Sequence, residues 1–497
     1  MVGGRLFTSH FAALLCACLL FLDVSPAGAA RRDKGLEKRL QAHIEVLASD
    51  EFEGREPGTE GEAKTLRYLA RKWFDIGLVS GTNDPGNEWF APVVLVAREP
   101  SGSSALFKRS GRLIPVPSES VLVLTSGKRS LVRDAPLLFV GKGEGLELSR
   151  NELAGRVAVL LEAGMRNGER QDALIAAGAS AVLTILDSGR SLEEVAARRT
   201  RSGYALAADT TGGDLEAFIS SEGMTSVLSG SRYTLEGLER AAERDDFAPR
   251  LIGLTASLEA ETIETRIRTY NLIGRLPGRR PESGAVLFLS HWDHFGICAE
   301  PPAEDLICNG AVDNASGVAA LTEIARRVAK GPRPERDIYF LATTAEELGL
   351  LGAHAFAESP PIPLSQIVAA FNLDTIAIAP RGTPLAIVGS GLSGLDEQIE
   401  MLAKQEKRRI VTSEDADEYV KRQDGWALLQ HDVPAVMVSS AYGNTNLVRR
   451  FFESHYHRPS DDLTHKLELG AAAQDVAFHV ALARWFGDAS RYPAPAR

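Results

Sequence analysis

Apolar residues recur at helical spacing in two stretches near the start of the chain. Residues 36 to 47 and residues 61 to 76 each carry apolar side chains three or four positions apart. Gly77 follows the second stretch, and a glycine at that place is a common helix stop. The spacing therefore predicts two amphipathic helices. The segment between them, SDEFEGREPGTEG, is rich in Gly, Pro and charge and is predicted to be a surface loop suited to a functional role.

Short β-rich runs replace the helical spacing between residues 116 and 262. The runs are SVLVLTS, APLLFVGKG, GRVAVLLEAG and SAVLTIL, and Gly-rich turns separate them. One helix is expected among them, near residues 170 to 177. His, Cys, Asp and Glu do not occur there with the spacing of a ligand set. The pattern predicts an inserted β-rich domain without chemistry of its own.

Strand-length apolar runs alternate with loops and helical patterns after residue 269. Four of them are AVLFLS (285–290), DIYFLAT (337–343), IVAAFNL (367–373) and VPAVMVS (433–439). Helical spacing follows Asp313, and Asn314 or Ser316 can cap that helix. This alternation predicts an α/β fold with a mixed, mainly parallel central sheet flanked by helices.

The first residues have the pattern of an export signal. An apolar run from 11 to 22 follows Arg5 and precedes Ala27-Gly28-Ala29, which predicts a signal peptide over residues 1–29 and a periplasmic or extracellular protein. The run is shorter than the roughly 20 residues that span a bilayer, so no integral membrane span is expected. Leu15-Cys16-Ala17-Cys18 leaves a lipoprotein as a minor alternative, although the apolar residues after it do not fit a mature lipoprotein start.

Composition narrows the class of partner. The 497 residues carry a formal net charge of -11 and are 44% hydrophobic, which suits two or three globular domains and provides no basic stripe for nucleic acid. A peptide or small molecule is the expected partner, and the oligomeric state is left open. Removal of the signal peptide leaves Cys298 and Cys308, for which an oxidising compartment favours a disulfide over two free thiols.

Five candidate metal ligands follow one another in the last half of the chain. They are His291 in HWDHFG, Asp313 in NGAVDNASG, Glu347 in TTAEELGLLG, Asp374 in FNLDTIA and His457 in SHYHRPSD. A single Asp or Glu at such a place is usually a helix cap or a solvated charge. Four of the five, however, follow predicted strands, and the binding crevice of an open α/β sheet lies at the strands' carboxyl ends. Two imidazoles and three carboxylates suit two Zn²⁺ ions.

Neighbouring residues supply the expected catalytic groups. Glu346, directly before Glu347, stands where a general base is needed for metal-assisted hydrolysis. Asp293 is expected to accept the second N–H of His291. Tyr456 is expected to donate to a developing oxyanion. His294 and His455 are interpreted as supporting or rim residues.

At these residues the chain resembles the zinc-dependent aminopeptidases, family 28 of the metallopeptidases, which includes bacterial leucyl aminopeptidases, glutamate carboxypeptidase and the non-enzymatic transferrin receptors. The resemblance covers residues 33–100 and 263–490, and residues 116–262 are similar to the protease-associated domain of that family. It implies that Asp313 bridges two metals and precedes a cis peptide, that Glu346 is the base, and that the shells are completed by His291, Glu347, Asp374 and His457.

The export pattern and the resemblance together predict five parts of the chain: a signal peptide (1–29), the first part of a catalytic domain (30–115), the insertion (116–262), the di-zinc core (263–490) and a tail (491–497). Departures from the family pattern concern substrate preference. They are Gln423 where serine is usual, Trp426 where a smaller residue is common, and His354 at a variable position. Asp424 fits either a pocket residue or a turn aspartate.

The function expected from these observations is an exported di-zinc exopeptidase, with aminopeptidase activity favoured. In the mechanism that the resemblance implies, a metal-bridging hydroxide attacks the scissile carbonyl while Glu346 shuttles the proton. A carboxypeptidase or dipeptidase on the same site remains open. A glutaminyl cyclase with one zinc ion, or a binding protein that has lost catalysis, is the further alternative; the presence of Glu346, Asp293 and Tyr456 weighs against the binding protein.

Overall fold

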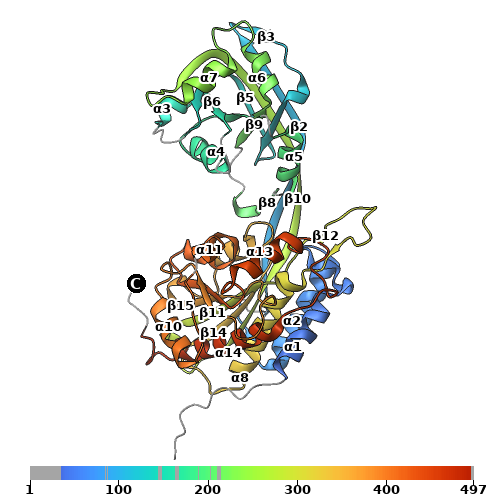
Figure 1. Cartoon of the computed structure of the whole chain (residues 1–497), viewed down its shortest axis with the longest axis vertical. Helices are drawn as coiled ribbons and strands as arrows, with labels where there is room; N and C mark the ends of the chain where they lie inside the picture. Colours follow the sequence, from blue (N-terminus) through green and yellow to red (C-terminus); the bar gives the residue numbers. More distant parts are fainter. Residues whose placement is uncertain are drawn as a thin grey trace, which may run out of the picture.

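The computed structural model describes residues 35–493, except 84–85, 87, 144–147, 163–166, 188–189, 202, 210–213 and 413. The expected signal peptide lies outside these residues. Two bodies are joined by a long two-stranded ribbon (Figure 1). We call the one that contains residues 35 and 493, the first and last that are described, the main body and the other the distal unit. No helix in the described ranges is long and apolar enough to cross a bilayer.

The main body is built on a mixed, mostly parallel sheet, as the sequence predicts. In order across the sheet its strands are β16 (Ala386–Val388), β17 (Ala435–Ser439), β15 (Ile367–Asn372), β11 (Ala285–His291), β14 (Asp337–Thr343) and β10 (Arg250–Leu276). β17, β15, β11 and β14 run parallel, whereas β16 and β10 are antiparallel to their neighbours. Every residue of β11 and of β14 is buried, which is why both read as unbroken apolar runs.

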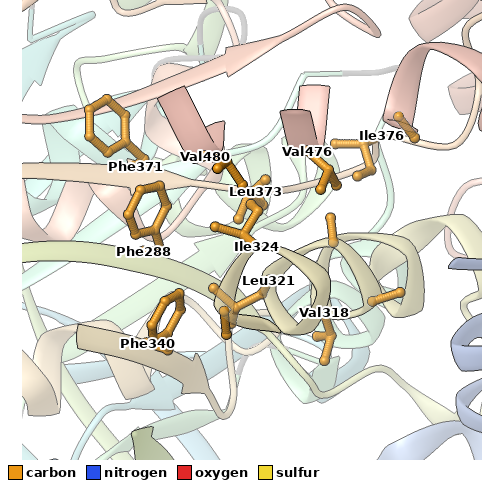
Figure 2. Close-up of a cluster of buried hydrophobic side chains, with 14 of the residues drawn as sticks. Phe288, Val318, Leu321, Ile324, Phe340, Phe371, Leu373, Ile376, Val476 and Val480 are labelled. Carbon is orange, nitrogen blue, oxygen red and sulfur yellow. The ribbon is translucent and has the colours of Figure 1, made fainter. Parts of the chain in front are cut away.

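Helices cover both faces of this sheet. The helices on one face are α1 (Leu36–Leu47), α2 (Glu60–Ile76), α8 (Gly317–Ala329) and α14 (Leu469–Phe486). On the other face lie α9 (Leu351–Glu358) and α12 (Gly425–Leu429). Figure 2 shows side chains of α8 and α14 beside aromatic rings from three neighbouring strands: Leu321, Ile324 and Val480 near Phe288, Phe340 and Phe371. The remaining helices are α10 (Asp396–Gln405), α11 (Glu414–Asp417) and α13 (Thr445–Ser454).

The two predicted N-terminal helices are confirmed, and local signals set the ends of the second. The Thr59 side chain accepts a hydrogen bond from the N–H of Glu62, and Gly77 closes the helix with φ 93°. The expectation of a plain surface loop before this helix is wrong in part. Residues 50–55 form a 3₁₀ helix in which Phe52, Gly54 and Arg55 are buried, because this segment packs under the loops of the main body.

The distal unit extends the ribbon of β2 (Phe90–Arg109) and β10. Its sheet runs β10, β5, β6, β7, β9, β4 and encloses a hydrophobic core of its own. The added strands are β3 (Arg112–Ile114), β4 (Val121–Thr125), β5 (Arg129–Gly141), β6 (Val157–Leu161), β7 (Ala181–Ile185), β8 (Tyr204–Leu206) and β9 (Leu215–Ile219). The proposed boundary between residues 262 and 263 falls inside the continuous strand β10.

The helix expected near residues 170 to 177 is confirmed as α4, but the expectation of a single helix in this region is wrong. Its described residues include five: α3 (Arg150–Leu153), α4 (Asn167–Ala176), α5 (Leu192–Arg201), α6 (Ser221–Leu228) and α7 (Leu235–Ala242). None is longer than 10 residues, so each provides too few turns for apolar periodicity to be recognised. The likeness to a protease-associated domain stays a prediction.

Three short strands complete the structure. β1 (Val79–Ser80) pairs with β10, and β12 (Gly296–Ile297) pairs with β13 (Ile307–Cys308). The Cys298–Cys308 disulfide, favoured from the sequence, closes the β12–β13 hairpin with 5.7 Å between the Cα atoms. β8 brings the distal unit against the main body, because Leu206 packs with Val93, Leu95 and Ala345.

Candidate active site

The five expected ligand residues lie together where the strands of the main sheet end. His291 is the last residue of β11, and its Nε2 lies 3.4 Å from Oδ1 of Asp313 and 3.6 Å from Oδ1 of Asp374. His457 follows α13, and its Nε2 lies 3.4 Å from Oδ2 of Asp313 and 3.0 Å from Oε2 of Glu347. The two oxygens of Asp313 therefore face two different imidazoles.

This cluster has the chemistry and spacing of a zinc site. Within the described part of the chain, Nε2 of His291 and Nε2 of His457 are buried and make no hydrogen bond. Two ligand atoms on one tetrahedral zinc ion, each about 2.0 to 2.1 Å from it, would be about 3.3 to 3.4 Å apart. The imidazole–carboxylate separations of 3.0 to 3.6 Å are close to that value. The imidazoles and carboxylates present therefore fit zinc.

The main chain at Asp313 is held by the side chain of Asp461. Asp461 accepts hydrogen bonds from the N–H groups of Val312 and Asp313, at 2.9 and 3.0 Å. The peptide bond between Asp313 and Asn314 is cis, as the family resemblance implies. Burial by itself would raise the pKa of Asp313, but the neighbouring imidazoles of His291 and His457 hold it far below its usual range. The carboxylate is therefore ionised and ready to bind cations.

Asp293 has a different part from the one expected. His291 Nδ1 lies 3.2 Å from the main-chain oxygen of Asp293 but 3.8 Å from the nearest carboxylate oxygen. The Asp293 carboxylate instead accepts the N–H groups of Glu346 and Glu347, at 3.1 and 3.4 Å. Burial raises the pKa of Asp293 to about 7. Its side chain thus fixes the turn that carries both glutamates, because that turn leaves β14 beside it.

Glu346 points into the cluster. Its Oε2 lies 3.8 Å from Nε2 of His291, and its side chain is 10% exposed. Burial raises the pKa of Glu346 well above its ordinary value; His291 lowers it, and Glu347 and Asp374 raise it further. A buried carboxylate with a raised pKa accepts a proton more readily than an exposed one, which suits a general base.

His457 and Tyr456 form the open side of the cluster. The side chain of His457 is 33% exposed, whereas that of His291 is 2% exposed. Burial lowers the pKa of His457, but the neighbouring carboxylates of Asp313 and Glu347 raise it, to about 9. The Tyr456 ring lies against the His457 ring, with 3.5 Å between centroids. Burial, together with Asp313 and Glu347, raises the pKa of Tyr456, so its phenol keeps its proton and can donate it in a hydrogen bond.

Three site residues were missed by the sequence reasoning: Arg55, Tyr442 and Asp461. Arg55 is 1% exposed and donates to the carbonyl oxygens of Leu47, Trp292, Asn309 and Gly310. Burial lowers its pKa to about 10. The only sign of Arg55 in the sequence was its place in the REPGT segment, within a loop whose composition is typical of a protein surface.

Tyr442 follows β17 and is 3% exposed. Burial, and then Asp374 and Asp313, raise the pKa of Tyr442 well above its ordinary value. A second protonated phenol therefore lies near the acidic cluster. Asp461 is buried beside Asp313, and burial raises its pKa to about 7. Both residues occur in stretches that show no ligand spacing, so only the fold brings them to the site.

The other singled-out residues divide into two groups. His294 Nδ1 lies 2.6 Å from Oε1 of Glu347, and Asp424 is buried next to the cluster, with a hydrogen bond from Thr343 and a pKa that burial raises to about 6. The pocket interpretation of Asp424 is thereby favoured over a turn. Four residues lie outside the cluster. His455 makes a hydrogen bond with the carbonyl oxygen of Ser460, and the side chain of Gln423 accepts one from the N–H of Gly425. Trp426 lies on α12 and His354 on α9.

Part of the chain matches a known family of peptidases. Residues 271–481 match the model of Peptidase family M28. The chain is 32% identical over 131 residues to a vacuolar membrane protease of Schizosaccharomyces japonicus, covering 25% of this chain and 14% of that protein. It is 31% identical over 157 residues to a probable glutamate carboxypeptidase of Arabidopsis thaliana, covering 31% and 20%. The matches thus span a fifth or less of these relatives.

A solved structure has the same fold. The aminopeptidase from Aneurinibacillus sp. strain AM-1 superposes with a TM-score of 0.50 at 17% identity, over 90% of this chain and 93% of that one. The family match covers β11, β14, β15 and β17 together with all five candidate ligands and Glu346. On this evidence the part of the chain that holds the candidate active site, residues 271–481, matches peptidase family M28.

Proposed function

We propose that the protein is an exported zinc aminopeptidase that works with two zinc ions. The observation that carries this proposal is the position of Asp313, whose two carboxylate oxygens face His291 and His457 separately. His291 and Asp374 would complete one zinc site, and His457 and Glu347 the other. The proposal agrees with the activity in the name of the Aneurinibacillus structure.

When bound, the two zinc ions would lower the pKa of an attacking water and polarise the scissile carbonyl. Glu346 accepts the proton that the water loses and delivers it to the leaving amine, a transfer for which its raised pKa is suited. Asp293 holds the main chain of Glu346, so the base keeps its direction. The phenol of Tyr456, protonated and on the open side, donates a hydrogen bond to the oxygen that becomes negatively charged.

Export is part of the proposal. Disulfides persist in oxidising compartments, and the Cys298–Cys308 bond closes a hairpin next to the site. The sequence pattern over residues 1–29 supports the same compartment. Edman sequencing of protein recovered from a periplasmic or culture fraction tests this directly. A start near residue 30 supports export, and an intact N-terminus in the cytosolic fraction contradicts it.

The activity is tested with a mixed peptide pool and zinc-loaded protein, with mass spectrometry of the products. Two variants of equal zinc content are compared: Glu346→Ala, and Glu400→Ala, which changes an exposed glutamate on α10. Ladders that lose N-terminal residues with the parent and with Glu400→Ala, but not with Glu346→Ala, support an aminopeptidase. C-terminal ladders would make it a carboxypeptidase. No Glu346-dependent product would contradict the peptidase proposal.

A further inference from the structure

Arg422 is a cation enclosed by aromatic rings at the edge of the candidate active site. Its guanidinium carbon lies 5.0 Å from the ring centre of Phe452, 5.4 Å from that of Tyr456 and 5.8 Å from that of Tyr419. Cation–π contacts on several sides hold the guanidinium plane in place without neutralising its charge. Arg422 is therefore a fixed positive group, not a freely moving surface arginine.

The guanidinium has unused hydrogen-bonding capacity. Its Nη2 donates to the hydroxyl oxygen of Tyr456 at 3.2 Å. No carboxylate in the described ranges lies within ion-pair distance of Arg422, and the residue is exposed to solvent. A guanidinium has five N–H donors arranged as a planar fork, and that fork matches the two oxygens of a carboxylate.

Tyr456 joins this cation to the reacting centre. Its ring lies on the ring of His457, and its hydroxyl oxygen accepts the hydrogen bond from Arg422. Burial and then Asp374 raise the pKa of Tyr442, whereas Arg422 lowers it. Arg422 thus provides a positive charge at the edge of the cluster of carboxylates.

We propose that Arg422 binds a carboxylate of the peptide substrate close to the scissile bond. The carboxylate belongs to the chain end of a short peptide or to an acidic side chain next to the cleaved bond, and both present the same pair of oxygens to the fork. This inference rests on the proposed function, since it assigns the substrate class of that site: peptides with a negative group near the bond that is hydrolysed.

The test is equilibrium binding by titration calorimetry, so that it does not depend on turnover. The parent is the zinc-loaded full protein with Glu346→Gln, which retains the site but removes the base. Three ligands share one N-terminal residue: leucyl-alanine, leucyl-alaninamide, and the α-amide of leucyl-glutamate. The first carries a terminal carboxylate, the second carries none, and the third carries a side-chain carboxylate.

Two substitutions are added to this parent. Arg422→Met removes the charge but retains an unbranched apolar stem against Phe452 and Tyr419. Lys421→Met removes the same charge one residue earlier, where Nζ lies 5.5 Å from the ring centre of Trp426. The Lys421 variant controls for the general effect of charge on anionic ligands.

The parent should bind at least one carboxylate ligand about tenfold more tightly than leucyl-alaninamide, as expected for one well-placed charged hydrogen-bonding group. Arg422→Met should abolish that preference and change binding of leucyl-alaninamide less than threefold, whereas Lys421→Met retains the preference. The ligand that shows the preference identifies the source of the carboxylate. A parent without any preference, or equal losses on all three ligands with Arg422→Met, overturns the inference. Failure of the proposed peptidase function would appear separately, as absence of Glu346-dependent cleavage.

Discussion

His294 and Glu347 are joined by a buried contact, with 2.6 Å between Nδ1 of the imidazole and Oε1 of the carboxylate. The other oxygen of Glu347 is then directed to Nε2 of His457, 3.0 Å away. The His294 ring has little freedom, because a Cβ placed on Gly310 would lie 2.7 Å from its Cγ and Cδ2 atoms. Gly310 has φ 55° and leaves the space that the ring occupies. His294 therefore orients a proposed zinc ligand.

Replacing His294 with asparagine or with glutamine distinguishes the roles of its two ring nitrogens. The amide nitrogen of His294→Asn can stand near Nδ1 and donate to Glu347, whereas that of His294→Gln lies near Nε2. Loss of a group that orients a metal ligand typically weakens metal binding by about 10- to 100-fold. We expect that loss for His294→Gln and a smaller one for His294→Asn, measured by competition with a zinc-binding dye. Equal zinc affinity in both variants and the parent would show that the contact has no orienting effect.

The disulfide should stabilise the hairpin between two proposed zinc ligands. Cys298 and Cys308 are 10 residues apart, and closing a loop of that size contributes about 2 to 3 kcal/mol in the chain-entropy model. The double variant Cys298→Ser/Cys308→Ser should lose that much free energy of unfolding in urea titrations. Each single serine variant, with the disulfide also absent, serves as the comparison. An unchanged unfolding midpoint in the double variant would argue against a stabilising role.

The buried carboxylate of Glu323 should make stability depend on acidity. Burial by itself would raise the pKa of Glu323, but hydrogen bonds from His43, Arg326 and Arg39 hold it far below its usual range. Because the folded pKa lies below the unfolded value of about 4.3, the ionised group stabilises the fold above that pH. This contribution is lost as the pH falls towards the folded pKa.

Glu323→Gln should therefore unfold more easily than the parent at pH 7, by about 1 to 2 kcal/mol, since it removes charged hydrogen bonds. The difference should shrink between about pH 5 and pH 3. Urea unfolding at several pH values measures both effects. Glu45→Gln, at an exposed position of α1, is the matched control and should behave like the parent. A difference that stays constant with pH would contradict the assignment to the Glu323 carboxylate.

Phe288 is a central part of the main core. Its ring lies 5.9 Å from that of Phe340 and 5.3 Å from that of Phe371, and the three rings come from neighbouring strands (Figure 2). Phe288→Ala should lower the free energy of unfolding by about 3 to 5 kcal/mol, because the cavity cannot close between packed strands. Phe74→Ala, at a side chain that is 71% exposed, should change it by less than about 0.5 kcal/mol. Similar losses in both variants would contradict this placement of the core.

Much of the main sheet could be predicted because its signals are local. Each central strand is buried on both faces, so it appears in the sequence as an apolar run of strand length, such as β11 and β14. Most helices of the distal unit were missed because none is longer than 10 residues, which leaves too few turns for apolar periodicity to be recognised. The continuous strand β10 was also missed, because its burial alternates along much of its length and changes where it enters the main body.

By itself the sequence determined the strands of the main sheet and the residue types of the site: two imidazoles, three carboxylates and Glu346 in a fixed order at strand ends. Parallel strands with covered faces bring such ends together, which is why this much follows from local pattern. Only the tertiary structure decided the supporting contacts. The carboxylate of Asp293 binds the Glu346 turn and not the His291 ring, Arg55 lies beneath the site, and Asp461 and Tyr442 approach the ligands. These contacts join residues far apart in the chain, and their geometry depends on how loops pack, which no local spacing encodes.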